Sequence, residues 1–376
     1  MGNRGDFGRR ASAVLRERGI STGSAARALG QDAAGLARVP AGKRIPSDRL
    51  VAAFDRAFPP DPRPAAEPDR PDPVRGCDEV AAVRAASQRL VLLDNSMTGR
   101  SAAGAAAREF AAVHRRLRTG DHDARYERDL WAAAAELAEV AGWACIEAER
   151  HPAADRLNRE ALLLARMSGD RSIELLIIQN LAMHAGWLGR PREELALARA
   201  VLEGRPLTPR VEAMFRIREA RGLMGTGRLA AGARSLARAR SLHADGERNG
   251  DPAWAWWVTP GEIDGHEGLG LHAAGRHADA VPFLERAARH SGSAVGYQAI
   301  FAARLLDCLL RTGRWRDAEE LARSVTPTVG EIGSVRTRNL LAGTARPGGA
   351  PDRAPIGVRD ALAALAAAVE GGRSDR

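Results

Sequence analysis

β-branched residues rarely alternate with polar residues along this chain, so the hydrophobic pattern predicts no β-strand. Between residues 125 and 340 the pattern instead indicates helices joined in pairs by short turns. Aromatic residues make up only 4% of the sequence, and alanine is abundant, so the core must depend on small side chains and close backbone approach. Helix pairs meet that requirement more easily than sheets do. We therefore predict an all-α protein.

A turn signature recurs at nearly constant spacing within this helical region. The turns are Glu149-Arg150, Gly189-Arg190, Gly227-Arg228, Gly275-Arg276 and Gly313-Arg314, which lie 40, 38, 48 and 38 residues apart. Small residues precede four of the turns by seven positions and follow four of them by five: Gly142, Ala182, Ala220 and Gly268, then Ala154, Gly232, Ala280 and Ala318. Small residues let two helices approach closely, and glycine favours the left-handed conformation that ends a helix. Such self-similarity is typical of a repeat array.

This repeat pattern resembles that of tetratricopeptide (TPR) repeats, although each unit is a few residues longer than usual. The resemblance implies a TPR-like α-solenoid whose concave face binds a peptide, a small-molecule effector or a partner protein.

The 48-residue interval contains the most unusual local sequence, GDPAWAWWVTPGEIDGHEGLGLH. Its three tryptophans, Trp254, Trp256 and Trp257, cannot all face one side of a helix. One interpretation is a core plug between two repeats. The other is that the tryptophans line the concave face as effector-binding residues together with three polar side chains. These are Glu262, Asp264 and His266.

Composition divides the chain into four segments. Seven prolines fall between Pro59 and Pro73, and proline removes backbone donors and fixes φ, so residues 59–75 are predicted to form an extended linker. The linker separates residues 1–58 from the repeat domain at 76–342. Residues 343–376 are expected to form a flexible tail with one short helix near Val358 to Glu370.

Positive charge is concentrated in the first of these segments. The whole chain carries a formal net charge of +9, of which residues 1–58 contribute +6 through ten arginines and Lys43 against five acidic residues. This is the charge distribution expected of a small domain that contacts nucleic acid, and a solvated arginine-rich face is the alternative.

Helical patterns in this segment run over residues 7–18, 24–29, 32–39 and 47–58, with Ser21, Asp32 and Ser47 as plausible caps. Arg16 to Gly19 ends the first helix, Ile20-Ser21 opens the second, and Ala26 and Gly30 occupy small-residue positions. Residues 42–46, GKRIP, follow the third helix. In these residues the segment resembles the helix-turn-helix of phage-repressor-like (XRE) transcriptional regulators.

The resemblance implies that the third helix enters the major groove of DNA. The residues it assigns to DNA contacts are Arg9, Arg10, Thr22, Arg27, Gln31, Ala34, Arg38, Lys43 and Arg44. The segment departs from the family in the recognition helix, where Ala33, Ala34 and Gly35 offer no hydrogen-bonding side chains. It therefore either binds DNA mainly through backbone phosphates, with strong salt dependence, or no longer reads sequence.

Motifs for catalysis, cofactors and metals are not recognisable. The sequence has no GxGxxG, GxxxxGK[ST] or GxSxG motif. His266, Glu267 and His272 do not fit HExxH, because that motif needs its histidines four residues apart. Cys77, Cys145 and Cys308 are too far apart for a CxxC site, and no apolar run is long enough to span a membrane. We expect no catalytic residues, cofactor or metal in a cytoplasmic protein.

The preferred hypothesis is a transcriptional regulator like the XRE-plus-repeat proteins of actinobacteria, acting as a homodimer in which an effector on the repeats controls DNA binding. One alternative is a protein-interaction scaffold whose helix-turn-helix no longer reads DNA. A second is a small-molecule-binding or catalytic solenoid recruited from a regulator.

Overall fold

The chain divides into two compact units, Met1–Pro73 and Val74–Arg376. The computed structural model describes residues 47–58 and positions 7, 11, 15, 25, 26 and 29 of the first unit. In the second unit it describes residues 75–96, 99–246, 248, 250–290, 299–346 and 354–374.

The first unit has a hydrophobic core of its own. Its α4 (Asp48–Ala57) begins at Ser47, whose Oγ accepts a hydrogen bond from the backbone N–H of Leu50 at 3.3 Å, as the sequence predicted. The rings of Phe7 and Phe54 meet edge to face, with centroids 5.3 Å apart. The other buried members are Ala11, Leu15, Ala25, Ala26, Leu50 and Phe58. Residues from both ends of the segment thus pack together.

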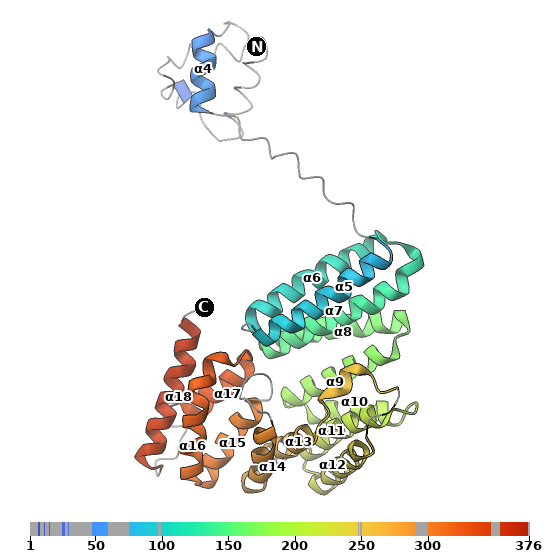
Figure 1. Ribbon diagram of the computed structural model, residues 1–376, viewed down its shortest axis with the longest axis vertical. Coiled ribbons are helices and arrows are strands. Elements are labelled where there is room, and N and C mark those ends of the chain that lie inside the picture. The colour runs from blue at the N-terminus through green and yellow to red at the C-terminus, as the bar shows by residue number, and fades with distance from the viewer. Residues whose placement is uncertain are drawn as a thin grey trace. The chain divides into compact units, whose positions relative to one another are not determined.

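The second unit consists of helices, with no β-strand among its described residues, so the prediction of an all-α protein is confirmed (Figure 1). In chain order the α-helices are α5 (Cys77–Ser96), α6 (Gly99–Thr119), α7 (Glu127–Glu147), α8 (His151–Ser168), α9 (Arg171–Trp187), α10 (Pro191–Leu202), α11 (Pro209–Gly225), α12 (Leu229–Ala244), α13 (Pro260–Ala273), α14 (His277–His290), α15 (Ala299–Thr312), α16 (Trp315–Val325), α17 (Val335–Ala345) and α18 (Ile356–Ser374). Three short 3-10 helices, η1 (Ala124–Tyr126), η2 (Ala253–Trp257) and η3 (Thr326–Glu331), connect some of them.

The predicted turns separate the two members of five consecutive helix pairs, α7/α8 to α15/α16. The first residue of each turn adopts positive φ: Glu149 56°, Gly189 71°, Gly227 82°, Gly275 74° and Gly313 72°. The arginine that follows donates its backbone N–H to the carbonyl five residues earlier, for example Arg190 to Ala185 at 2.9 Å. This left-handed helix ending satisfies carbonyl groups that the last turn leaves without partners.

Close approach within the pairs explains the small residues around each turn. A Cβ added at Gly142 would lie 2.6 Å from Asn158 Nδ2 on α8, and one at Gly268 would lie 2.6 Å from Leu284 Cγ on α14. The alanines at the predicted positions are fully buried: Ala154, Ala182, Ala220, Ala280 and Ala318. Larger residues at these crossings would force the helices apart.

The C-terminal segment differs from the sequence expectation of a flexible tail with one short helix. Helix α17 reaches Ala345, and α18 spans 19 residues rather than the shorter range predicted. Val358, Leu362, Leu365 and Val369 of α18 are buried in the hydrophobic cluster that also includes α15 and α16. Helix α18 is therefore packed against the final repeat. The apolar face of its alanine-rich sequence covers the hydrophobic cluster of α15 and α16.

Helix α17 also contacts the first repeat, far away in sequence. Arg336 Nη2 lies 2.5 Å from Glu147 Oε1 at the end of α7, and Asn339 Nδ2 donates to Glu149 Oε2 in the first turn. Figure 1 shows α17 beside that end of the α7/α8 pair. The helix after the fifth repeat therefore returns to the beginning of the array.

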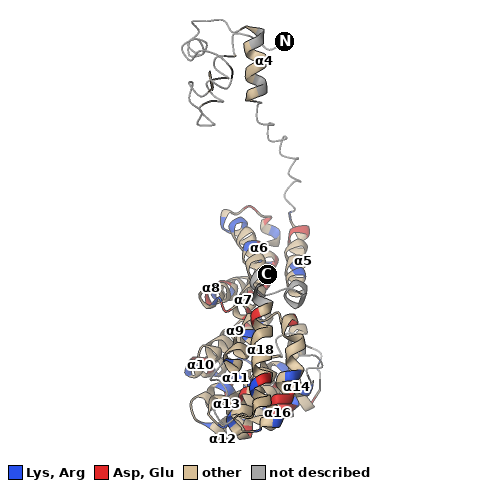
Figure 2. Cartoon of the chain, turned by 90° about the vertical axis from the view of Figure 1, so that its left-hand side faces the viewer, with Lys and Arg blue, Asp and Glu red and all other residues tan. Residues whose placement is uncertain are grey.

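The charged residues of this unit are mixed in sign. Figure 2 shows basic and acidic residues on the same helices, as on α16. Within the described residues, no helix combines the length and the apolar character needed to cross a lipid bilayer.

Candidate functional site: a cavity lined by tryptophan and arginine

A cavity of about 380 Å³ lies on the inner face of the repeat array. The first helices of the repeats, α7, α9, α11, α13 and α15, contribute most of its wall, and η2, α10, α17 and α5 complete it. Its aromatic lining residues are Trp143, Trp187, Trp254, Trp257 and Phe301. Its polar lining residues are Glu139, Gln179, Asn180, Glu194, Arg218, Arg221, Glu262, His266 and Arg336. An aromatic wall with a few convergent polar groups is the usual composition of a small-molecule site.

Helical periodicity places these side chains on one face of each helix. On α9 the cavity residues Leu176, Asn180, Met183 and Trp187 follow the i, i+4, i+7, i+11 spacing of a single stripe. Pairs three or four residues apart do the same on α7, α11 and α13. The first helix of each repeat can therefore pack against its neighbours and still present one stripe of side chains to the cavity.

The predicted effector-binding residues lie partly in this cavity. Trp254, Trp257, Glu262 and His266 line it, and the two tryptophans also pack against the hydrophobic core. The two tryptophans therefore combine core packing with a place in the cavity wall, and their role in effector binding stays a prediction. The tryptophans lie on the 3-10 helix η2, and the indole Nε1 of Trp254 donates to Ser172 Oγ at 2.9 Å. The side chain of Trp256 lies outside the described residues.

Asp264 belongs to a different surface of α13. Its carboxylate accepts hydrogen bonds from Arg240 at 2.6 Å and from Arg286 at 2.8 Å, and Asp264 does not line the cavity. It lies two positions from both Glu262 and His266 along the chain, which is about half a helical turn. The prediction grouped all three by sequence proximity, and the helical period places Asp264 on the outer side.

A chain of hydrogen bonds crosses the wall from α7 to α11. Asn180 Nδ2 donates to Glu139 Oε1 at 2.6 Å, and Gln179 Nε2 donates to Asn180 Oδ1 at 2.7 Å. Arg218 Nε then donates to Gln179 Oε1 at 2.8 Å. Gln179, Asn180 and Arg218 are all buried. Because each amide uses its oxygen as acceptor and its nitrogen as donor, the chain fixes the orientation of both amides.

Two glutamates of the cavity hold protons unusually tightly. Burial raises the pKa of Glu139 to about 7, against the hydrogen bond from Asn180, and the nearby Glu136 raises it further. Burial also raises the pKa of Glu194 to about 7, although the Arg221 and Arg218 guanidinium groups oppose that shift. Both carboxyl groups are therefore partly neutral near neutral pH.

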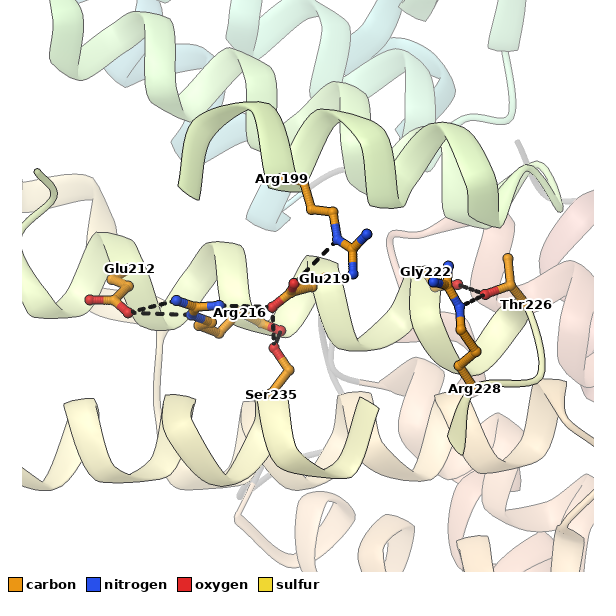
Figure 3. A network of polar contacts seen from close by, with 8 residues as sticks. All are labelled: Arg199, Glu212, Arg216, Glu219, Gly222, Thr226, Arg228 and Ser235. Atoms are coloured by element: carbon orange, nitrogen blue, oxygen red, sulfur yellow. Dashed lines mark hydrogen bonds and ion pairs between the residues drawn. The ribbon is translucent and has the colours of Figure 1, made fainter. Parts of the chain in front are cut away.

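The two cavity arginines of α11, Arg218 and Arg221, are weakly paired in comparison with Arg216 on the same helix. Figure 3 shows Arg216 of α11 between Glu212 and Glu219, at 3.2 and 3.0 Å. Arg218, by contrast, donates to a neutral amide, and the Nη1 atom of Arg221 is buried without a hydrogen-bond partner in the described chain. Burial lowers the pKa of Arg218 to about 10 and also lowers that of Arg221, which leaves both groups charged at neutral pH.

His266 is a neutral imidazole at the floor of the cavity. Burial, and then the positive charges of Arg218, Arg221 and Arg336, hold its pKa well below the ordinary value. Its Nε2 lies 3.6 Å from Glu262 Oε2, and its Nδ1 is buried without a partner in the described chain. A neutral imidazole can offer one donor and one acceptor to a ligand.

Arg336 on α17 also lines the cavity. Its guanidinium carbon lies 4.7 Å from the centre of the Trp187 ring, in addition to the ion pair with Glu147. Arg218 similarly lies 5.7 Å from the ring of Trp257. These cation–π contacts hold both guanidinium groups against the aromatic wall.

Sequence reasoning missed most of the polar wall, although one signal was available. Glu194 stands five residues after its turn, where four other units have alanine or glycine. It is 2% exposed, and Gly186 on α9 leaves the space that its carboxylate occupies. A charged residue at a position of close helix packing marks a departure from the repeat pattern, and here the departure lies in the cavity.

The DNA-contacting residues predicted from the resemblance all lie outside the described residues. They are Arg9, Arg10, Thr22, Arg27, Gln31, Ala34, Arg38, Lys43 and Arg44. Those assignments stay predictions.

Comparison of the chain with protein-family models, with curated proteins and with solved structures finds no match. A function can therefore be inferred only from the cavity and from the sequence of the N-terminal segment.

Proposed function

We propose that this protein is a transcriptional regulator controlled by a small molecule. Its repeat unit binds an anionic ligand with an aromatic or other apolar part in the cavity, and its basic N-terminal unit binds DNA. The observation that carries the proposal is an aromatic-lined cavity in which neither Arg218 nor Arg221 forms an ion pair with a carboxylate of the described residues.

The balance of charge favours an anion. Arg336 is neutralised by Glu147, whereas Arg218 and Arg221 keep their charges beside Glu194, which is partly protonated at neutral pH. The carboxyl group of Glu262 also lies near Arg218. A ligand carboxylate, sulfonate or phosphate would supply the acceptor that Arg221 Nη1 lacks, and charge-assisted hydrogen bonds of this kind are strong. The tryptophans would enclose the apolar part of the ligand.

Binding can be tested with an anionic fluorescent probe, anilinonaphthalene sulfonate, titrated into the full-length protein. Arg221→Gln should weaken binding by about 10- to 100-fold, the equivalent of one charged hydrogen bond of roughly 1.5–3 kcal/mol. Arg216→Gln is the matched control, because Arg216 lies on the same helix and pairs with Glu212 and Glu219 outside the cavity. Equal affinities for the two variants would refute an anion site at Arg221.

The pH dependence of probe affinity distinguishes a site for anions from a site for cations. Protonation of Glu139 and Glu194 removes negative charge, so the affinity for the sulfonate probe should rise at least about fivefold as the pH falls from 8 to 6. The charges that face these carboxyl groups are Glu136 beside Glu139 and the two arginines beside Glu194. A cationic aromatic probe, N-methylacridinium, should show the opposite trend, and preferential binding of this probe would reverse the assignment of ligand charge.

DNA binding is supported by the charge of residues 1–58, by their resemblance to the XRE helix-turn-helix and by the separate core of this unit. The test is fluorescence anisotropy with the DNA upstream of the protein's own coding sequence. Contacts to phosphates should weaken steeply between about 50 and 200 mM salt. Arg38→Ala, Lys43→Ala and Arg44→Ala should each reduce both the affinity and the salt dependence. Sedimentation of the complex would show whether two chains bind one site, as a homodimer requires.

A catalytic role for the cavity is the second candidate, because carboxyl groups with a pKa near 7 in a cleft are suited to proton transfer. Mass spectrometry of the ligand released from protein purified from its own cells would separate the two functions. A regulator should release its ligand unchanged. An enzyme should convert it, and Glu139→Gln or Glu194→Gln should abolish the conversion. A co-purifying protein together with absence of DNA binding would favour the scaffold alternative.

A further inference from the structure

A second cluster of chemically reactive side chains lies outside the cavity, where α13, α14 and α15 meet. His272 is in the last turn of α13 and His277 is the first residue of α14. The left-handed turn at Gly275 between them brings the two rings back together, with centroids 5.2 Å apart. Cys308 of α15 is fully buried beside them. One nitrogen of each ring and the Cys308 sulfur all lie within 4.8 Å of one another.

The surroundings of the two histidines provide further evidence for a metal ligand role. Asp307 Oδ2 lies 2.7 Å from His272 Nε2 and also accepts from Arg311 Nε at 2.8 Å, which fixes the carboxylate and the ring. If Nε2 carries the proton that Asp307 accepts, the lone pair of His272 is on Nδ1. A carboxylate that holds a histidine in this way is the usual partner of a metal-bound imidazole. His277 Nδ1 is buried without a hydrogen-bond partner in the described chain.

We propose that His272, His277 and Cys308 bind one Zn²⁺ ion. Two imidazole nitrogens and a thiolate suit the ligand preferences of Zn²⁺, whereas Mg²⁺ and Ca²⁺ require oxygen ligands. Asp307 orients His272, and water occupies the fourth position because both histidines are only partly buried. On binding, the Cys308 thiol loses its proton to solvent, and no electron transfer is involved.

The sequence did not reveal this group because its members are spread over three helices. His272 attracted attention only as an imperfect HExxH match with His266, and the structure separates those two. His266 lines the cavity, whereas His272 bonds to Asp307. The zinc site is therefore independent of the proposed ligand cavity, and either can fail without the other.

Cobalt provides a direct test, because thiolate-bound tetrahedral Co²⁺ has a ligand-to-metal charge-transfer band and intense visible bands. All variants of the full-length protein carry Cys77→Ser, since Cys77 is an exposed thiol. After removal of metals with a chelator, this parent protein should bind one equivalent of Co²⁺ with both spectral features, and Zn²⁺ should displace the cobalt.

Cys308→Ala should abolish the charge-transfer band, and His277→Gln should weaken Co²⁺ binding at least tenfold. Asp307→Asn should weaken it by about 10- to 100-fold, the range typical of a residue that orients a metal ligand. Cys145→Ala is the matched control, because Cys145 is also a buried free cysteine but lies on α7. Circular dichroism checks the fold of each variant, and His277→Gln, a change at a partly exposed residue, keeps the test decisive if Cys308→Ala does not fold. Absence of the band in the parent, its persistence in the Cys308 variant, or Co²⁺ binding that is not weakened in the His277 variant would overturn the proposal.

Discussion

Replacement of Glu139 by glutamine should stabilise the protein at high pH and leave its stability unchanged at low pH. Glutamine has the shape of the protonated carboxyl group and can still accept the hydrogen bond from Asn180. In the folded state the pKa of Glu139 is raised to about 7 from an ordinary value of 4.5. The carboxyl group therefore contributes its full stability below about pH 4.5 and loses it as the pH rises through 7.

The size of the effect follows from the two pKa values. A tenfold change in a protonation equilibrium corresponds to about 1.4 kcal/mol, so ionisation of the partly buried Glu139 carboxyl group should lower the free energy of unfolding by roughly 3 kcal/mol above pH 7. Glu139→Gln should be more stable than the wild type by about this amount at pH 8, and the two should be equal near pH 4.5. Urea unfolding at several pH values measures the difference.

The comparison must be made between variants, because histidines act in the opposite direction over the same pH range. Burial lowers the pKa of His184 to about 4 and that of His266 further below its ordinary value, so both make folding less favourable as the pH falls. The difference between wild type and Glu139→Gln cancels these contributions. Glu212→Gln, which breaks a partly buried ion pair with Arg216 outside the cavity, serves as control and should show no gain at high pH. If the Glu139→Gln protein is no more stable than the wild type at pH 8, the raised pKa of Glu139 is refuted.

Three further substitutions test the packing around the site. Arg336→Met should lower the free energy of unfolding by about 3–5 kcal/mol, because Glu147 is left buried without its cation, and adding Glu147→Gln should restore much of the loss. Gly222→Ala places a Cβ 2.8 Å from a backbone carbonyl of α10 and should cost about 1–3 kcal/mol in urea unfolding; a neutral result would mean that the two helices can separate freely. Gly186→Ala puts a Cβ where the Glu194 carboxylate lies and should weaken sulfonate probe binding, and Glu194→Ala in the same chain should relieve the clash.

The repeat turns could be predicted from sequence because their physics is local. The helix ending at a glycine, or at Glu149 in the first turn, depends only on the backbone conformation of that residue and on the carbonyl groups of the preceding helical turn. The predicted turns from Glu149 to Gly313 are accordingly all found with positive φ. Small residues at helix crossings were equally visible, since their requirement repeats with the array.

The cavity was only partly predictable because it depends on which helices converge. Trp254 and Trp257 drew attention by their clustering in sequence, whereas Arg218 and Arg336 lie on separate helices with nothing unusual beside them. Buried arginines look like surface arginines in a single sequence that is rich in this residue. The length and packing of the C-terminal helix were underestimated for a related reason. The proline- and glycine-rich break before it suggests a free tail, and the sequence does not show that α18 packs on the hydrophobic cluster of the last repeat.

The contact between α17 and α7 has a consequence for how the protein unfolds. In an open solenoid each unit touches only its neighbours, so the terminal units can fray and stability accumulates unit by unit. Here Glu147 and Arg336 are 189 residues apart, and their contact requires all of the intervening helices to be in place. Such a contact forms late in folding because of its high sequence separation. We therefore expect the five repeats to melt in one cooperative transition, with neither end of the array released ahead of the other.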